Sequence, residues 1–249
     1  MAYQLFYWPG LQGRGEFVRL ALEEAGAPYE DVARTQGTPA LIEAMKNPDP
    51  AHRPFAPPFL TDGALLISQT ANILYYLGPR LNLAPADDAG RLRVNALQLT
   101  IADMVAEAHD THHPVSVELY YEDQKPEALR RAEDFTHKRM PKYLGYFEDV
   151  LKNSPGKAGW LCGDAMTYAD LSLFQLVEGL AYAFPKALAH VAPAMPGVMA
   201  LRDAVARRPR IAAYLQSPRR LPFNEDGLFR HYPELDAAHD APQYYANPT

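Results

Sequence analysis

The sequence predicts an α/β unit of about 80 residues followed by an all-α domain, because its patterning changes twice along the chain. Short aromatic and apolar segments alternate with helical patterns up to residue 80, a proline-containing connection follows, and helical periodicity dominates beyond residue 90. We therefore assign residues 1–80 to the α/β unit, 81–90 to a linker, 91–218 to the helical domain and 219–249 to an irregular C-terminal tail.

The first residues have the order strand, helix, strand. Residues 3–7 (YQLFY) are dense in aromatic and apolar side chains and precede a Pro-Gly pair, which predicts a short buried strand. Between residues 14 and 25 the apolar side chains recur at helical spacing, and Gly26 supplies the stop. A second strand over residues 29–33 completes a βαβ unit, in which the two strands run parallel.

The rest of the α/β unit is predicted to contain a loop, a hairpin and a helix. A weak helical pattern over residues 39–46 precedes a proline-rich stretch that excludes regular structure. Residues 59–67 carry an Asp-Gly pair between two apolar runs, which is typical of a tight β-hairpin. Ser68 is placed to cap a helix that ends at the Gly-Pro pair of residues 78–79, so the unit has the order βαβαββα.

The second domain is predicted to be entirely helical. Pro114 should kink or divide its first helix. Thr167 and Asp170 have the spacing of a capping box before an apolar run, so we assign Asp170 a structural role. Apolar periodicity indicates helices over residues 92–117, 125–152, 170–182, 197–207 and 211–215.

Charge and composition exclude several functions. The 249 residues carry a formal net charge of −6, so the chain lacks the basic surface that binds nucleic acid. No basic segment leads into an apolar stretch at the N-terminus, and charged residues interrupt the longest apolar region, so we expect neither an export signal nor a membrane span. The single cysteine, Cys162, cannot form an internal disulfide, which fits a reducing, cytoplasmic compartment.

Tyr7 ends the first strand, just before the loop that leads into the first helix. The start of a helix offers unpaired N–H groups and a partial positive charge, which stabilise a bound anion. At such a place a tyrosine hydroxyl can donate a hydrogen bond to a thiolate and so favour ionisation of the thiol. The alternative is an aromatic side chain that only packs in the core, and the local pattern leaves both interpretations open.

Two further segments could contact a ligand. The bond between Pro57 and Pro58 can be cis, which would turn main-chain groups outward to pair with an extended peptide, or it can be an ordinary trans bond in a loop. Ser68, Gln69 and Thr70 open a helix, so their N–H groups and short polar side chains could hold a carboxylate or could form a plain N-cap.

Three histidines, His109, His112 and His113, have a spacing that can gather metal ligands on one helix face. The sequence offers no fourth ligand nearby, and Pro114 disturbs the helix. We therefore predict no metal site and expect these side chains to line a cleft or to face solvent.

In their order along the chain, these features resemble the cytosolic glutathione transferase superfamily, in its tyrosine-type classes. The similarity extends from residue 3 to about residue 215 and implies a thioredoxin-like N-terminal domain, an all-helical C-terminal domain and a homodimer. Its most specific segments are FAPPFLTDGALLISQTANILYYLG (55–78), GDAMTYADLSLF (163–174) and RRPRIAAYL (207–215).

The resemblance implies roles for individual residues. Tyr7 matches the catalytic tyrosine, Pro58 matches the cis-proline, and the pair Gln69 and Thr70 matches the pair that binds the γ-glutamyl group of glutathione. Further candidates for the glutathione site are Trp8, Arg14, Lys46, Arg53, Pro57 and Asp110, and candidates for the electrophile pocket are His113, Tyr120 and Tyr121.

Two features depart from the family pattern. Pro57 has no N–H, which removes one of the main-chain hydrogen bonds that the family makes to the cysteinyl part of glutathione, at a cost of about 1 kcal/mol. The tail beyond residue 218 is unusual, and its aromatic side chains could roof the electrophile pocket or cover a dimer surface; they are Phe223, Phe229, Tyr232, Tyr244 and Tyr245.

The resemblance predicts a glutathione transferase. Glutathione is then the co-substrate, and Tyr7 activates its thiol for attack on a small hydrophobic electrophile, a reaction typical of detoxification. No metal or redox cofactor is required for this chemistry. Pro57 keeps open the alternative of a non-catalytic ligand carrier or protein-interaction module with the same fold.

Overall fold

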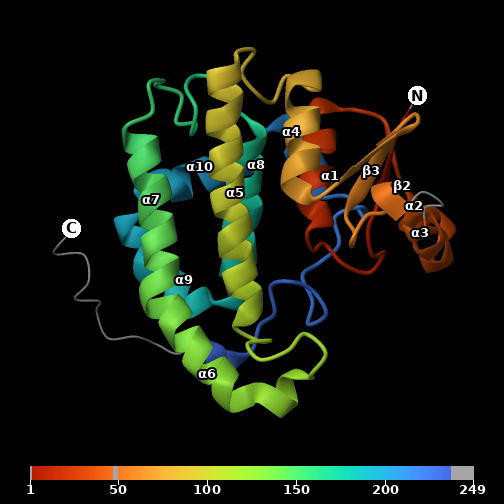
Figure 1. Cartoon of the computed structure of the whole chain (residues 1–249). Helices are drawn as coiled ribbons and strands as arrows, with labels where there is room; N and C mark the ends of the chain where they lie inside the picture. The colour runs from red at the N-terminus through yellow and green to blue at the C-terminus, as the bar shows by residue number, and fades with distance from the viewer. Residues whose placement is uncertain (1, 47–49, 237–249) are drawn as a thin grey trace.

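A four-stranded sheet with helices on both faces lies beside a larger group of helices (Figure 1). The computed structural model of the protein describes residues 2–46 and 50–236. The first part contains β1 (Tyr3–Phe6), α1 (Gly15–Ala25), β2 (Tyr29–Asp31), α2 (Val32–Gln36), α3 (Thr38–Met45), β3 (Phe59–Asp62), β4 (Leu65–Ser68) and α4 (Thr70–Arg80). The second part contains α5 (Asp88–Asp110), α6 (Lys125–Asp134), α7 (Met140–Lys152), α8 (Tyr168–Ala183), α9 (Pro185–Val191), α10 (Pro196–Ala206) and α11 (Pro209–Leu215).

The sheet has the strand order β2-β1-β3-β4. β1 pairs with β2 in parallel, which confirms the predicted βαβ unit. β1 and β3 are antiparallel, as are β3 and β4, which form the predicted hairpin. Gly63 in the hairpin turn has a φ of +60°, a conformation that glycine adopts without strain.

Alternate side chains of the strands enter two separate cores, since successive residues of a strand point to opposite faces. On one face Leu5 and Leu60 pack with apolar residues of α1 and α4. On the other face Phe6 and Phe59 stack with their ring centroids 4.5 Å apart and pack with residues of α2 and α3. Figure 1 shows α1 and α4 between the sheet and α5, so this layer joins the two parts.

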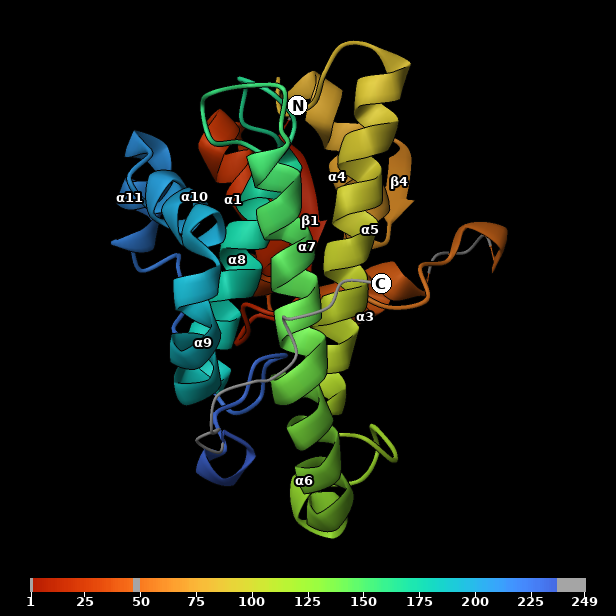
Figure 2. The same cartoon turned by 90° about the vertical axis from the view of Figure 1, so that its left-hand side faces the viewer.

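α8 is the central helix of the second part. It packs against α5, α9 and α10, and it also contacts α1 of the first part. In Figure 2, α8 lies between α10 and α7, and α5 lies on the other side of α7. Within residues 2–46 and 50–236, no helix is both long enough and apolar enough to cross a bilayer.

The structure moves several predicted helix ends. α4 continues through Pro79 to Arg80, because a proline in the last turn removes only one main-chain donor. α5 begins at Asp88, inside the predicted linker 81–90, because the Asp87 carboxylate caps it by accepting the Gly90 N–H at 2.8 Å. α5 ends at Asp110, so the prediction of a helix up to residue 117 was wrong.

Other segments have a different secondary structure from the one that the sequence predicted. Residues 32–36 form the helix α2, where the sequence predicted the end of a strand. The predicted helix 125–152 consists of α6, one π-helical turn (Phe135–Arg139) and α7. α9 was not predicted, because its seven residues are too few for a periodic pattern to emerge. In the described part of the tail, residues 219–236, only a short 3-10 turn interrupts the irregular structure that was predicted.

The predicted capping box at the start of α8 is confirmed. The carboxylate of Asp170, which is fully buried, accepts hydrogen bonds from the Thr167 main-chain N–H at 2.7 Å and from the Thr167 hydroxyl at 2.8 Å. Its other oxygen accepts the N–H of Leu161 at 2.8 Å. Asp170 therefore fixes both the start of the central helix and the loop before it.

Replacing Asp170 with alanine leaves the N–H groups of Leu161 and Thr167 without acceptors in the interior. We expect the free energy of unfolding to fall by about 2–4 kcal/mol, measured by urea denaturation. Asp170→Asn keeps one acceptor oxygen and should lose less. The matched control is Asp103→Ala on the exposed side of α5, which should change the free energy by less than about 0.5 kcal/mol. Equal losses in Asp170→Ala and Asp103→Ala would contradict the assignment.

Candidate functional site

Tyr7 follows β1 directly, and its hydroxyl lies at the start of α1. The side chain is 5% exposed. The main-chain N–H of Arg14 donates a hydrogen bond to the Tyr7 hydroxyl oxygen over 2.9 Å. Gly13 has a φ of +47°, and a Cβ at this position would stand 2.1 Å from the same oxygen, so the loop requires glycine here. The main chain of Gly13 and Arg14 therefore packs directly against the Tyr7 hydroxyl.

The Tyr7 hydroxyl keeps its proton at neutral pH. Burial raises the pKa of Tyr7, and the hydrogen bond from the Arg14 main chain together with the charges of Arg14 and Arg19 offsets only part of that rise. Since the oxygen already accepts one hydrogen bond, the hydroxyl proton can be donated to an acceptor at the start of α1. Tyr7 is therefore suited to donate a hydrogen bond to an anion and unsuited to act as a base.

A cavity of about 370 Å³ lies between α4 and α5 and extends to the start of α1. Arg14 and Phe17 line it on the α1 side, while Tyr7 is not part of its wall. The remaining walls include Gln69, Thr70 and Asn72 from the start of α4, and Asn95, Gln98, Leu99 and Ala102 from α5. Three residues that the sequence singled out for one ligand, Arg14, Gln69 and Thr70, therefore border the same cavity.

Two polar atoms at this wall have no hydrogen-bond partner. They are the hydroxyl oxygen of Thr70 and the amide oxygen of Gln98, and both are buried. A buried polar atom without a partner costs about 1–3 kcal/mol, which a polar ligand that reaches it can offset. Gln69 stands at the N-cap of α4, its side chain does not cap the helix, and both Gln69 and Thr70 border the cavity, so the start of α4 lies at the cavity wall.

Four other residues that were predicted for the same ligand lie elsewhere. Trp8 packs against the core beside α2 and α3. Lys46 is exposed and forms an ion pair with Glu43 at 3.0 Å, and Arg53 is also exposed. Asp110 is the last residue of α5, and its side chain is about half exposed. None of the four lines the cavity.

The Pro57-Pro58 bond is cis, as the sequence allowed. Pro58 is buried directly before β3, whereas Pro57 is half-buried and Phe55 is almost fully exposed. Pro57 has no N–H, so only its carbonyl can pair with a ligand at this point.

The three residues predicted for an electrophile pocket are not gathered in one pocket. Tyr121 is buried, its hydroxyl donates to Glu234 at 2.9 Å, and its ring stacks on Tyr232 with centroids 3.8 Å apart. Tyr120 is 79% exposed, and the His113 ring contacts His112. This arrangement was not predicted from the sequence, because both partners of Tyr121 come from the tail, more than one hundred residues away.

The tail crosses back over the loop that precedes α1. The Gln12 side-chain amide donates to the Leu221 carbonyl at 2.5 Å, and the Asn224 amide donates to the Gly10 carbonyl at 3.0 Å. A small gap of about 10 Å³ remains between this loop and the tail, bordered by Gln12, Gly13, Phe223, Leu228 and Phe229. The tail therefore roofs the loop beside Tyr7. Tyr244 and Tyr245 lie outside the described residues.

Comparison with known proteins shows what the chain resembles. The family model described as Glutathione S-transferase, C-terminal domain, matches residues 109–218. Glutathione S-transferase Mu 3 of Mus musculus is 28% identical over 229 residues, which cover 89% of this chain and 94% of the relative. The chain is thus similar to glutathione transferases over most of its length. The predicted fold class, a thioredoxin-like domain followed by a helical domain, is thereby confirmed.

Two solved structures show the same fold. The Pi-class glutathione S-transferase of Onchocerca volvulus has a TM-score of 0.70 at 20% identity and covers 91% of this chain and 99% of its own. The glutathione S-transferase Na-GST-3 of Necator americanus, described as monomeric, has a TM-score of 0.66 at 22% identity. The match covers 90% of this chain and 100% of Na-GST-3. Both likenesses extend over the two domains.

The α5 side of the cavity was not predicted from the sequence. Asn95, Leu99 and Ala102 are spaced four and three residues apart, so they share one face of α5, and this spacing is visible in the sequence. Nothing in the sequence showed that this face would stand opposite the start of α4. Gln12 was missed because its partner, Leu221, is distant in the chain.

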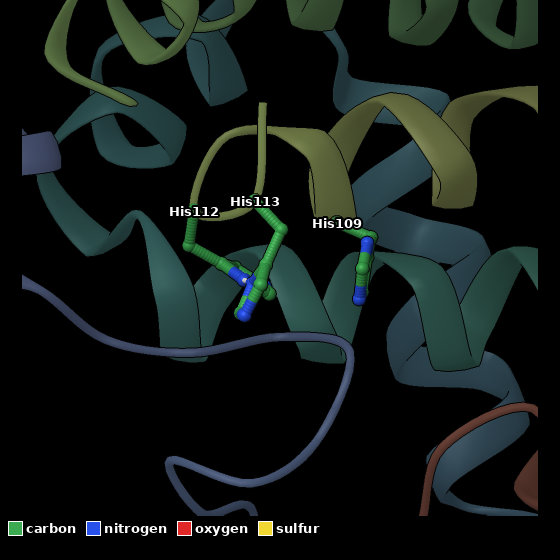
Figure 3. A group of neighbouring side chains, drawn as sticks. All are labelled: His109, His112 and His113. Carbon is green, nitrogen blue, oxygen red and sulfur yellow. Dashed lines mark hydrogen bonds between the residues drawn. The ribbon is translucent and has the colours of Figure 1, made fainter. Parts of the chain in front are cut away.

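The three histidines lie at the C-terminal end of α5 and in the turn that follows it. The nearest ring nitrogens of His109, His112 and His113 all lie within 4.8 Å of one another (Figure 3). The expectation that they line a cleft or face solvent does not hold for His112, which is only 1% exposed. The turn after Asp110 brings His112 and His113 back toward His109, because the helix has already ended before Pro114.

Below the Tyr7 loop, a buried carboxylate joins the two domains of the transferase fold. Glu16 is fully buried in the first turn of α1. It accepts a hydrogen bond from the Tyr214 hydroxyl at 2.6 Å and forms ion pairs with Arg19 at 3.1 Å and Arg220 at 2.7 Å. These partners come from α11, α1 and the tail. Glu16 therefore fixes the start of α1 relative to both.

The stability of the protein should depend on the charge of Glu16. Burial alone would raise its pKa, but Arg220, Arg19 and the Tyr214 hydroxyl outweigh burial and hold the pKa below its ordinary value of 4.5. A carboxyl with a lower pKa in the folded state stabilises the protein above pH 4.5, and this contribution is lost as the pH falls through the folded-state pKa.

We expect Glu16→Gln to lower the free energy of unfolding by about 3–5 kcal/mol at pH 7, because Arg19 and Arg220 lose a buried partner. The variant should also lose stability less steeply than the unmodified protein between pH 6 and pH 3. Chemical denaturation at a series of pH values measures both effects. Glu43→Gln, an exposed i,i+3 pair with Lys46, is the control and should behave like the unmodified protein.

Proposed function

We propose that the protein is a glutathione transferase that binds glutathione in the cavity between α4 and α5 and activates its thiol with Tyr7. The unpartnered oxygens of Thr70 and Gln98 and the uncapped start of α4 support binding of the γ-glutamyl end. Arg14 borders the cavity, and its main-chain N–H donates a hydrogen bond to the Tyr7 hydroxyl, so Arg14 links the cavity to Tyr7. This adjacency is the observation that carries the proposal.

The proposed chemistry rests on the protonated state of Tyr7. Its O–H donates a hydrogen bond to the glutathione sulfur, and this bond is stronger to the thiolate than to the thiol. Lowering a thiol pKa from about 9 toward 6.5 requires about 3 kcal/mol, which one charge-assisted hydrogen bond and the start of α1 can supply together. The thiolate then attacks the electrophile and forms a carbon–sulfur bond, and a leaving group departs or the product takes up a proton.

We propose that the electrophile binds between the Tyr7 loop and the tail. Gly13 contacts the Tyr7 hydroxyl, and Phe223 and Phe229 border the small gap on the other side of Gly13. Their rings offer the apolar surface that a small hydrophobic electrophile needs. Because the gap holds only about 10 Å³, the tail has to move outward when an electrophile enters. A cytoplasmic location and a role in detoxification are part of the same proposal.

Tyr7→Phe should lower turnover of a chloronitroarene at pH 6.5 by about 10–100-fold, which corresponds to about 1.4–2.8 kcal/mol of lost stabilisation of the thiolate. The affinity for glutathione should change by less than about threefold, since most of its contacts remain. Turnover is measured from pH 6 to pH 9 together with the ultraviolet difference spectrum of the bound thiolate. The loss should shrink at high pH, where the thiol ionises without assistance.

The matched control for this experiment is Tyr76→Phe. This phenol donates to Asp62 at 2.9 Å on the far side of α4, so its removal should leave turnover unchanged. Unchanged turnover in Tyr7→Phe at pH 6.5 would contradict the assignment of Tyr7.

A non-catalytic carrier is the second candidate function, because Pro57 lacks an N–H and Tyr7 does not line the cavity. Retention on immobilised glutathione combined with the turnover assay separates the candidates. Binding with turnover supports the transferase, and binding without turnover supports the carrier. Absence of both supports a protein-interaction module.

We also propose that the protein forms a homodimer through the side of α4 and α5 that faces away from α8. Large apolar side chains are exposed on α5, where Leu92 is 60% and Leu99 50% exposed, and in the segment before β3, where Phe55 is 92% exposed. Figure 2 shows the described segment before β3, residues 50–58, projecting beyond the rest of the fold, and this segment contains Phe55. Such a surface is typical of a buried interface, because a monomer in water gains nothing by exposing it.

Phe55→Ser should weaken the dimer at least tenfold, because an exposed phenyl ring that becomes buried contributes about 1.5–3 kcal/mol. Sedimentation velocity over a range of protein concentrations measures the dissociation constant. Val117→Ser, which changes another exposed apolar residue in the segment after α5, should leave the dissociation constant unchanged. A monomeric unmodified protein, as described for Na-GST-3, would refute the dimer.

A further inference from the structure

Three imidazoles converge at the C-terminal end of α5, outside the cavity that the proposed function uses. His109 stands in the last turn of the helix, and His112 and His113 follow in the next turn of the chain. The ring centroids are 4.7 Å apart for His112 and His113, 4.8 Å for His109 and His112, and 5.3 Å for His109 and His113. Figure 3 shows the three rings pointing to the same side of the helix end.

The orientation of His112 is fixed by the tail. Its Nε2 lies 2.9 Å from the main-chain carbonyl oxygen of Leu228, which can only accept a hydrogen bond, so Nε2 carries the proton. The lone pair of neutral His112 is therefore on Nδ1, and Nδ1 points at the Nδ1 of His113 over 2.5 Å. A carbonyl behind the non-coordinating nitrogen is the arrangement that holds metal-binding histidines in place.

Burial favours the uncharged form of all three imidazoles. Burial, followed by nearby cationic groups, lowers the pKa of His109 to about 4, and burial lowers the pKa of His112 to about 3. Burial lowers the pKa of His113 as well. Neutral imidazoles keep the lone pairs that a metal ion needs, so no proton has to be expelled from a charged ring before coordination.

The donor set selects the class of metal. Three imidazole nitrogens suit Zn²⁺ and its neighbours in the first transition row, whereas Mg²⁺ and Ca²⁺ require several oxygen ligands. The nearest carboxylate, Asp110, lies 3.8 Å from His109 Nδ1. Arg14 and Arg230 act on the cluster with positive charge, which opposes a bare cation and favours an anion or hydroxide in the fourth position.

We propose that His109, His112 and His113 form a three-histidine site for a divalent transition-metal ion of the Zn²⁺ type, with the fourth position open to water or a small anion. Tetrahedral Zn²⁺ with Zn–N bonds of 2.0–2.1 Å holds its ligand nitrogens about 3.3 Å apart. This value falls between the 2.5 Å of the shortest pair and the 4.8 Å within which all three lie, so small rotations of the rings suffice.

Binding of a metal ion by His112 and His113 replaces the hydrogen bond between their Nδ1 atoms. In the metal-free protein the proton between His112 and His113 resides on His113 Nδ1, because His112 Nδ1 is the acceptor. When both nitrogens bind the ion, this proton moves to His113 Nε2, and the imidazole stays neutral. The site does not depend on glutathione or on Tyr7, so the proposal stands or falls separately from the proposed function.

Isothermal titration of the untagged protein with ZnCl2, in a buffer without thiols, tests the site. We expect one Zn²⁺ per chain with a dissociation constant in the micromolar range, and His109→Ala and His113→Ala should each weaken binding at least tenfold. Both side chains are partly exposed, so these variants should fold, unlike variants of the buried His112. His190→Ala, at the end of α9, is the control and should bind like the unmodified protein.

A second measurement uses Co²⁺, whose visible absorption reports the number and type of its ligands. The unmodified protein should give the intense bands of a four-coordinate nitrogen site, and His109→Ala and His113→Ala should lose them. Absence of stoichiometric Zn²⁺ binding would overturn the proposal. Equal binding by His109→Ala, His113→Ala and the unmodified protein would overturn it as well.

Discussion

The ionised carboxylate of Glu16 is the constraint on which the site depends. A fully buried charge is tolerated only because Arg19, Arg220 and Tyr214 all point at it. Arg19 lies on the same helix as Glu16, whereas Tyr214 and Arg220 come from α11 and the tail, about 200 residues later, so the charge is fully satisfied only when α11 and the tail pack against α1. The loop between Tyr7 and Arg14 ends two residues before Glu16, so the position of Glu16 fixes the position of the loop end.

Local sequence patterns predicted the elements whose cause is local. The parallel start of the sheet, the Asp-Gly hairpin and the capping box of Asp170 follow from spacing within a few residues, and the structure contains all three. The cis bond at Pro57 and Pro58 and the convergence of Arg14, Gln69 and Thr70 on one cavity came from the family resemblance, since spacing alone does not bring α1 and α4 together.

The features that sequence reasoning missed have distant causes. Tyr121 was assigned to a pocket, but its hydroxyl contacts Glu234, and no local pattern connects these residues. The helical spacing of the three histidines suggested ligands on one helix face, whereas two of them lie beyond the helix end, where the chain turns and the Leu228 carbonyl orients His112. In each case the tail supplies the missing partner, and its weak periodicity gave no indication of where it would lie.

The contact between Gln12 and Leu221 has a consequence for how the protein is made. During synthesis the N-terminal domain leaves the ribosome first and can fold as a unit before the remainder of the chain exists. The loop that contains Gln12 stays uncovered until the segment around Leu221 has been translated. Completion of this region is therefore a late event in biogenesis, and a nascent chain released too early would retain its sheet while the glycine-rich loop stayed bare.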